Sequence, residues 1–354
     1  MRAERQLCAL LFGLGLIGCA PEPISDGFVQ AETGQAVVPG VAMRFPEDHG
    51  PHPEFGLEWW YVTANLKDDQ GQWHGVQWTL FRFRGPEGSE NAWWQGQGYL
   101  AHLMHEQGNQ HRAWERSGRG TQAKIQAQPF IAGLDHWWMR SVTSDYQPLH
   151  LVASEEDFAL ALEMAGSPLV RHGQAGFSDK SGDGKLASYY YSLPRLQVQG
   201  HLKTQGQWRA VEGEAWLDRE WSSALLDDRF GGWDWMGLQL DDGRNLMLFC
   251  LLPRSSGERH CDGSLIAETG EVITLVNERI QWDALAHVDL EGARYPVKWQ
   301  ITLPSHDISL QVATRSRDQL NRLGVQYWEG PVEVSGSVSG RGFVEMTARG
   351  SQGH

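Results

Sequence analysis

Short runs of alternating hydrophobic and polar residues, separated by polar turns, make up most of the chain beyond residue 40. The clearest example spans residues 58–66 and is followed by a polar turn at residues 67–71 and a second alternating run at residues 76–83. A period of two residues is typical of β-strands, because successive side chains face opposite sides of a sheet. These runs therefore predict a β-hairpin.

The same pattern recurs along the rest of the chain, where helical periodicity is scarce. The 41 Gly and 17 Trp also favour β structure over helix. Further strands are predicted at residues 98–104, 159–164, 189–199, 208–217, 235–240, 245–252, 297–303, 308–313, 332–338 and 343–347.

Two hairpins follow the same plan, one at residues 58–83 and one at residues 233–252, where Asp-Gly forms the turn. Short strands joined by polar turns are typical of sandwiches and barrels. We predict an all-β protein of two barrel-like domains, at residues 41–203 and 204–354, with the boundary in the Gly-containing stretch near residues 200–206.

The first 18 residues have the pattern of an export signal. A basic start is followed by an apolar run at residues 7–17 and by Leu16-Ile17-Gly18-Cys19, which has the form of a lipobox. The run is too short to span a bilayer, so we expect residues 1–18 to be a signal peptide. Cys19 would then carry a lipid anchor, and residues 19–40 would form a flexible tether. The alternative is an ordinary buried N-terminal helix.

Ala20 after the cysteine favours the outer membrane of a Gram-negative bacterium over the inner one. We expect a lipoprotein of the cell envelope that faces the periplasm. The net charge of −14 argues against nucleic acid or anionic head groups as partners. Cys250 and Cys261 flank a polar turn, where they either form a disulfide in an oxidising compartment or remain two small hydrophobic residues.

The sequence lacks the motifs of several common classes of enzyme. In the Gly-Ser-Val-Ser-Gly run at residues 336–340, Val stands where a serine hydrolase has its nucleophile. His102 and His105 would face opposite sides of a strand, which makes them a poor metal pair. Without a phosphate-binding Gly loop or a dinucleotide fingerprint, we expect neither a metal nor another cofactor.

Carboxylates beside indole rings are the candidate chemistry. The pairing occurs in four short segments, at residues 58–61, 218–221, 233–235 and 328–329. A carboxyl group packed against indole rings loses hydration, so its pKa rises toward that of a general acid, while aromatic faces attract positive charge. Together these properties suit protonation of an alkene and capture of the cation by water. The alternative is a set of structural ion pairs and core Trp residues.

Several segments taken together resemble the carotenoid 1,2-hydratase-like (AttH-like) family, which is lipocalin-like and includes bacterial lipoproteins. The resemblance extends over roughly residues 41–350. It implies two lipocalin-like β-barrel domains packed together, with a site for an apolar ligand between or inside them. The segments are FPEDHGPHPEFGLEWWYVTANL, SYYYSLPRLQVQG, GEAWLDREWSS, GWDWMGLQLDDGRNLMLF, YWEGPVEVSG and GFVEMTARG.

Three functions fit these observations. An enzyme would hydrate or isomerise an unsaturated apolar molecule, such as an isoprenoid or a lipid, by acid catalysis. A binding protein would hold a lipid or peptide for the permease of an ABC-type membrane transporter and do no chemistry. A third reading is a carbohydrate site that uses the same acids.

Asp234 is the first candidate for the acid, because Trp233 and Trp235 flank it. In a strand these two Trp side chains face away from Asp234, so the ring that desolvates it must come from Trp221 or Trp60. The other candidates are Glu58, Glu220 and Asp218 as acid or base; Tyr190 as a proton donor; His102 as a relay or an ordinary core histidine; and Trp60, Trp221, Trp233, Trp235, Tyr327 and Trp328 as ligand contacts.

Overall fold

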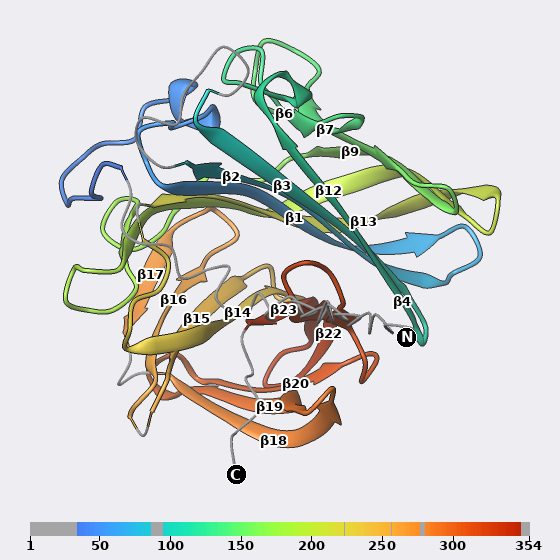
Figure 1. Cartoon of the computed structure of the whole chain (residues 1–354). Helices are drawn as coiled ribbons and strands as arrows, with labels where there is room; N and C mark the ends of the chain where they lie inside the picture. Colours follow the sequence, from blue (N-terminus) through green and yellow to red (C-terminus); the bar gives the residue numbers. More distant parts are fainter. Residues whose placement is uncertain (1–33, 86–94, 223, 256, 277–279, 348–354) are drawn as a thin grey trace, which may run out of the picture.

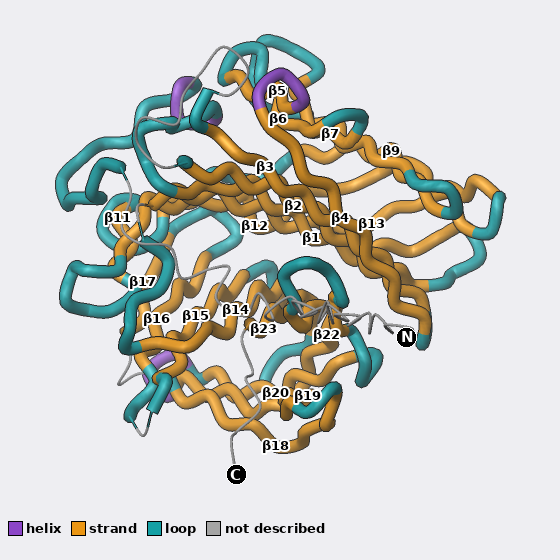
Figure 2. Tube along the Cα trace, viewed as in Figure 1, coloured by secondary structure: helices purple, strands orange, loops and turns teal. Residues whose placement is uncertain are grey.

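The computed structural model describes residues 34–85, 95–222, 224–255, 257–276 and 280–347 (Figure 1). The expected signal peptide and the lipidation site Cys19 lie outside these residues. Strands make up nearly all of the secondary structure (Figure 2). In the described ranges no helix is long and apolar enough to cross a membrane. The helical segments are the 3-10 turns η2(Glu47–His49), η3(Gly120–Gln122) and η5(Pro304–His306).

The first domain is a 13-stranded antiparallel sheet with the order β4-β3-β2-β1-β13-β12-β9-β8-β7-β6-β5, to which β10 and β11 add by pairing with β12. The sheet curls until β6 contacts β2, β3 and β4, and it encloses a core that includes Trp60, Trp78 and Trp137. Its strands are β1(Leu57–Asp68), β2(Trp73–Arg84), β3(Gln97–Gln107), β4(Gln110–Arg119), β5(Ala123–Gln126), β6(Ile131–Leu134), β7(Trp137–Ser141), β8(Leu149–Ser154), β9(Phe158–Ala165), β10(Val170–Arg171), β11(Phe177–Asp179), β12(Ala187–Thr204) and β13(Gln207–Ser222).

The second domain is a 10-stranded antiparallel sheet with the order β17-β16-β15-β14-β23-β22-β20-β19-β18, with β21 paired to β22. It curls around a core of its own that includes Trp299 and Trp328. Its strands are β14(Phe230–Leu240), β15(Asn245–Pro253), β16(His260–Ile266), β17(Val272–Val276), β18(Gln281–Leu290), β19(Ala293–Leu303), β20(Ile308–Thr314), β21(Leu320–Asn321), β22(Tyr327–Gly336) and β23(Gly340–Thr347).

The predicted boundary between residues 203 and 204 is wrong, because it falls inside a hairpin of the first sheet. Thr204 pairs with Gln207 across a two-residue turn, in which Gln205 and Gly206 both have positive φ. Such a turn matches the twist of a hairpin, so the Gly that suggested a linker closes two neighbouring strands instead. β13 also pairs through residues 211–222 with the whole of β1, and the chain enters the second sheet only after Ser222.

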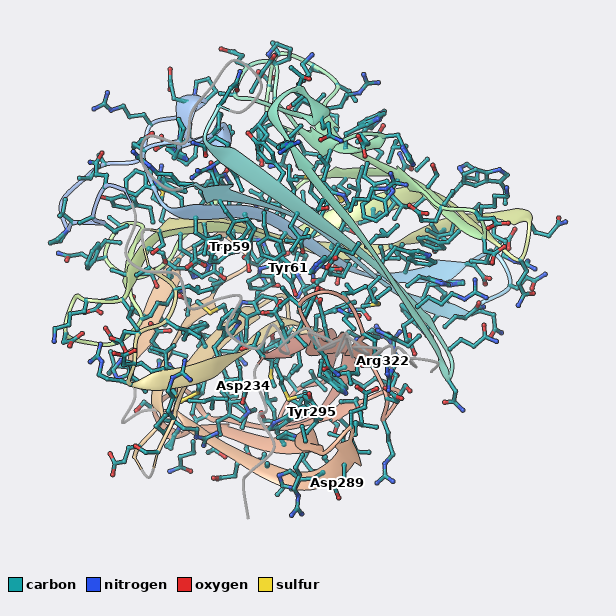
Figure 3. All side chains as sticks on the ribbon, viewed as in Figure 1. Trp59, Tyr61, Asp234, Asp289, Tyr295 and Arg322 are labelled. Carbon is teal, nitrogen blue, oxygen red and sulfur yellow. A yellow bond between two sulfur atoms is a disulfide. The ribbon has the colours of Figure 1, made fainter. Side chains whose placement is uncertain are left out.

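Alternation along the strands divides each sheet into an inner and an outer face. On β1, Trp60 and Val62 belong to the core of the first domain, whereas Trp59 and Tyr61 lie between the two sheets (Figure 3). On β14 the residue Met236 belongs to the second core. The outer faces of the two domains therefore pack against each other and bury a third apolar cluster, to which both sheets contribute.

Candidate functional site

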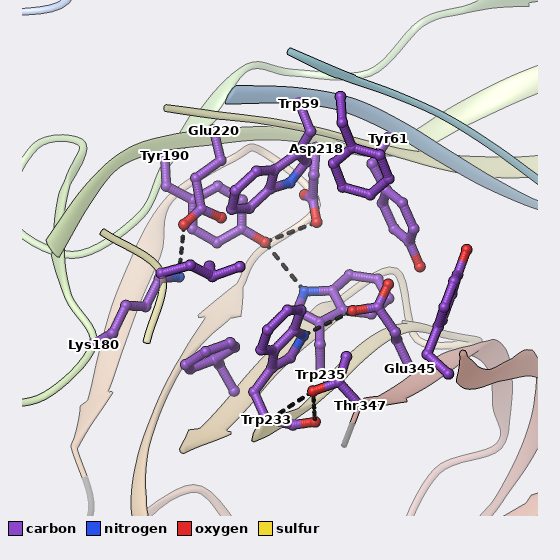
Figure 4. A pocket seen from close by; sticks show the side chains of 14 residues that line it. Trp59, Tyr61, Lys180, Tyr190, Asp218, Glu220, Trp233, Trp235, Glu345 and Thr347 are labelled. Carbon is purple, nitrogen blue, oxygen red and sulfur yellow. Dashed lines mark hydrogen bonds and ion pairs between the residues drawn. The ribbon is translucent and has the colours of Figure 1, made fainter. Parts of the chain in front are cut away.

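A pocket lies between the two domains. β1, β2, β12 and β13 supply side chains from the first domain, and β14, β15, β22 and β23 supply them from the second (Figure 4). The cavity is small, with a volume of about 60 Å³. The lining residues are Trp59, Tyr61, Phe81, Lys180, Tyr190, Asp218, Glu220, Leu225, Trp233, Trp235, Phe249, Tyr327, Glu345 and Thr347.

The register of the first sheet brings acids and aromatic rings together on its outer face. Trp59 of β1 lies opposite Glu220 of β13, and Tyr61 lies opposite Asp218. On the other side of β13, Tyr190 of β12 lies opposite Glu220. Directly opposed side chains in antiparallel strands are close enough to interact. The three neighbouring strands thus supply one wall of aromatic rings and carboxylates.

Asp218 is buried and held by several donors. The indole N–H of Trp216 donates to its Oδ1 at 2.6 Å, and the Tyr190 hydroxyl donates to its Oδ2 at 2.8 Å. The Ser192 hydroxyl also donates to Oδ1. Burial raises the pKa of Asp218 to about 7, with a smaller contribution from the charge of Glu220, although these donors oppose the shift. Asp218 is therefore a buried carboxyl group with both oxygens engaged.

Glu345 is the second acid of the pocket with a raised pKa. It lies on β23 opposite Trp235, and the indole N–H of Trp233 donates to its Oε1 at 2.7 Å. Burial raises the pKa of Glu345 to about 7, and the charges of Asp218 and Glu220 act in the same direction. Glu345 thus combines a pKa near neutrality with a position on the pocket wall, which are the properties of a general acid.

Lys180 and Glu220 form an ion pair at one end of the pocket, with 3.4 Å between Lys180 Nζ and Glu220 Oε1. The ammonium group lies 4.4 Å from the ring centre of Tyr190 and 4.5 Å from that of Phe249. Both members of the pair are buried. The pocket therefore has a charged end surrounded by aromatic rings.

Tyr327 links the pocket to a polar chain at the domain interface. Its hydroxyl lies 2.9 Å from Nδ1 of His102, whose Nε2 lies 3.1 Å from Oε2 of Glu115. Burial raises the pKa of Tyr327 well above its usual range, and the charge of Glu329 adds to this effect. His102 does not line the pocket itself, but it contacts a residue that does.

Glu58 lies on the inner side of the first sheet, away from the pocket. Arg82 and Arg219 contact its carboxylate, the backbone N–H of His52 donates to it, and Nδ1 of His52 lies 3.2 Å from it. Burial alone would raise the pKa of Glu58, but the positive charges of Arg219 and Arg82 and the hydrogen bond from His52 hold it well below its usual range. Glu58 is therefore a carboxylate locked between two arginines rather than a proton donor at neutral pH.

Two of the residues predicted to contact the ligand, Trp60 and Trp221, also lie on the inner side of the first sheet. Trp60 is fully buried in the core of the first domain. Trp221 stacks on the His52 ring with a centroid distance of 4.0 Å. In the same way, Trp328 belongs to the core of the second domain.

Asp234, the first candidate for the acid, is buried but does not line the pocket. It pairs in register with Cys250 on β15 and Met346 on β23, both of which belong to the second core. The alternation that sends Trp233 and Trp235 into the pocket sends Asp234 the other way. Figure 3 marks its position in the second domain.

Two functional candidates escaped the sequence analysis. Glu345 carried a weak signal, because it is an acid in an otherwise apolar strand, between the core residues Val344 and Met346. Lys180 carried none, because its neighbours in the polar loop are Asp, Ser and Gly rather than aromatic residues. Of the predicted residues, the structure brings Glu220, Asp218, Tyr190, Trp233, Trp235 and Tyr327 together in the pocket.

Fold and pocket together define a protein of two curled antiparallel sheets with an acid-lined, aromatic pocket between them. The chain belongs to the AttH-like family, whose model matches residues 36–349. The crystal structure of a putative AttH from Nitrosomonas europaea superposes with a TM-score of 0.81 at 32% identity, covering 89% of this chain and 99% of that one.

Two further proteins extend the comparison. Kievitone hydratase from Nectria haematococca shares the fold, with a TM-score of 0.68 at 15% identity, over 90% of this chain and 96% of that one. The dehydratase asqC from Emericella nidulans is 23% identical over 152 residues, which are 39% of this chain and 41% of that protein. This chain thus matches less than half of the length of that dehydratase.

Proposed function

We propose that the pocket between the two domains adds water to, or removes water from, an apolar unsaturated molecule such as an isoprenoid or a lipid, and that Glu345 is the general acid. The observation that carries this proposal is a half-buried carboxyl group with a pKa of about 7, on the wall of an aromatic pocket. About half of such groups still hold the proton at pH 7, whereas a solvated glutamate has lost it.

The reaction follows from the properties of the lining. The Glu345 carboxyl group donates its proton to one carbon of an alkene, and the positive charge develops on the neighbouring carbon. Faces of Trp59 and Trp235 attract that charge. Water then attacks the cation and loses a proton to the Glu345 carboxylate, so that the acid is regenerated. Dehydration is the same sequence in reverse.

The comparisons support this reaction class. A hydratase shares the fold, and a dehydratase matches part of the sequence. Their names describe those proteins, and their substrates do not transfer to this chain. What this chain has of its own is a set of acidic and aromatic side chains that suits proton transfer to and from an apolar ligand.

A non-catalytic carrier is the second candidate. It is favoured by the state of Asp218, whose two oxygens are both engaged by protein donors, as expected of a carboxyl group that shapes a static pocket. In that case the protein holds a lipid or peptide for the permease of an ABC-type transporter. Native mass spectrometry of the protein purified from its own host tests the choice of ligand. A co-purifying apolar molecule supports both candidates, and a bound sugar contradicts them.

We also propose that the protein is anchored in the cell envelope through Cys19, as the lipobox suggests. Labelled palmitate should enter the wild-type chain, and Cys19→Ser should abolish the label. A wild type that stays unlabelled would rule out the anchor.

A further inference from the structure

We propose that the buried pair of Lys180 and Glu220 binds a neutral oxygen atom of the ligand, a ketone carbonyl or a hydroxyl group. This inference rests on the proposed function and narrows its substrate class. The ligand is then an oxygenated apolar molecule rather than a pure hydrocarbon. It carries its oxygen at one end of the pocket and its reacting double bond toward Glu345.

Burial of the ion pair is the first argument. Lys180 is 5% exposed and Glu220 is 4% exposed, and aromatic rings surround them. Charges removed from water need hydrogen-bond partners to offset the lost hydration. The ammonium group has three N–H donors, and its ion pair is with a single carboxylate. A carbonyl oxygen of a ligand supplies a further acceptor for Lys180, and a hydroxyl group can also donate to Glu220.

The charges around the pair argue for a neutral ligand group. Glu220 already balances the charge of Lys180. Asp262 lies close enough for its charge to act on both of them, and its buried Oδ1 has no hydrogen-bond partner among the described residues. A ligand carboxylate at Lys180 would lie next to the carboxylate of Glu220 and be repelled. A carbonyl or hydroxyl dipole can instead point its oxygen at the ammonium group without adding charge.

The loop that carries Lys180 is held in place by its own hydrogen bonds. The Asp179 carboxylate accepts the backbone N–H groups of Gly182 and Gly184, both at 2.9 Å. Both glycines have positive φ, a conformation that side chains other than Gly rarely adopt. Lys180, next to Asp179, is thereby fixed against β12, with its ammonium group inside the pocket. A fixed donor is what selective recognition of a ligand oxygen requires.

The positions of the acids set the direction of the ligand. Figure 4 shows Lys180 and Glu220 together at one side of the pocket and Glu345 at the other, with Trp235 between them. A flat ligand that places its oxygen at Lys180 therefore runs past the aromatic rings toward Glu345. This order matches a substrate with a polar end and an apolar unsaturated end.

Three probes of similar size test the inference by isothermal titration calorimetry on the full chain: acetophenone, isopropylbenzene and benzoate. Water solvates isopropylbenzene least, so a purely apolar pocket favours it over acetophenone. We expect the opposite order, with acetophenone binding about 10-fold more tightly, because a hydrogen bond to a charged donor exceeds the difference in hydration. Benzoate should bind most weakly.

Lys180→Met should remove the preference for acetophenone and leave the affinity for isopropylbenzene unchanged. Lys185→Met is the matched control, because it removes a charge from an exposed position of the same loop and should retain the preference. If Lys180→Met fails to fold because Glu220 is left without its partner, the double variant Lys180→Met with Glu220→Gln removes both charges and serves the same purpose.

The outcomes separate this inference from the proposed function. Tighter binding of isopropylbenzene than of acetophenone by both wild type and Lys180→Met would show an apolar site without oxygen recognition, so the inference would be wrong and the proposed function would stand. Tightest binding of benzoate would mean an anion site and would also overturn the inference. If neither neutral probe binds, the pocket does not take small apolar molecules, and the inference falls together with the proposed function.

Discussion

Burial affects the acids of this protein in opposite directions, depending on which charges face them. Glu58 is fully buried, yet two arginines hold its pKa below the usual range. Glu345 is half-buried and its neighbours with charge are other acids, so lost hydration and these charges raise its pKa to about 7. In the sequence, Glu58 and Glu345 are both simply glutamates in β-strands. Only the arrangement of partners separates a locked anion from a proton donor.

At the residue scale, Glu345→Gln should change how stability depends on pH. In the wild type, Glu345 keeps its proton in the folded state until about pH 7, whereas the unfolded chain loses it near pH 4.5. The stability that this proton contributes is present below pH 4.5 and is lost as the pH rises through 7, a difference of about 3 kcal/mol. The variant carries no charge there. The melting temperature of the variant minus that of the wild type should therefore increase between pH 5 and pH 8.

Scanning calorimetry at several pH values measures this difference directly. Glu333→Gln is the control, because it removes an exposed carboxylate from the neighbouring strand β22 and should give a constant offset. A constant offset for Glu345→Gln as well would mean that the pKa of Glu345 is not raised.

At the scale of single elements, the two faces of each strand explain which strands could be predicted from the sequence and which could not. The alternating pattern predicted the central strands β1, β2, β12, β13, β14 and β15, because each has one face in a core. It missed β4, which lies at the sheet edge and has mostly polar, partly exposed side chains. It also placed the domain boundary near the turn at residues 205–206, since a turn and a domain boundary have the same local composition.

The hairpin of β15 and β16 gives a prediction at this scale. Cys250 and Cys261 lie opposite each other in register and form a disulfide. The bond spans a sequence separation of 11 residues. Closing a loop of this size restricts the unfolded chain and stabilises a protein by roughly 2–3 kcal/mol.

Replacing both residues by Ala should therefore lower the free energy of unfolding in urea by that amount. Alkylation of the unfolded wild type should modify Cys250 and Cys261 only after reduction. Modification of both without reductant would show that the bond does not form in the protein.

At the scale of the whole molecule, the pocket exists because two outer faces meet. Trp59 and Trp235 come from different sheets, and no local pattern shows which strands will face each other across a domain interface. This is why the sequence analysis found the acids of β13 but not Glu345, and why it favoured Asp234. The aromatic segments indicated a ligand site, whereas the pairing of the two sheets decided which acids belong to it.

Incorporation of heavy oxygen is the measurement that tests the central claim most directly. The apolar ligand that co-purifies with the protein is incubated in H2¹⁸O with wild type, Glu345→Gln and the control Glu333→Gln. Wild type and control should place ¹⁸O in the product, while Glu345→Gln should bind the ligand equally well and turn it over about 100-fold or more slowly. Turnover by Glu345→Gln at the wild-type rate, or no incorporation by any of the three proteins, would contradict the account of this pocket as an acid-catalysed hydration site.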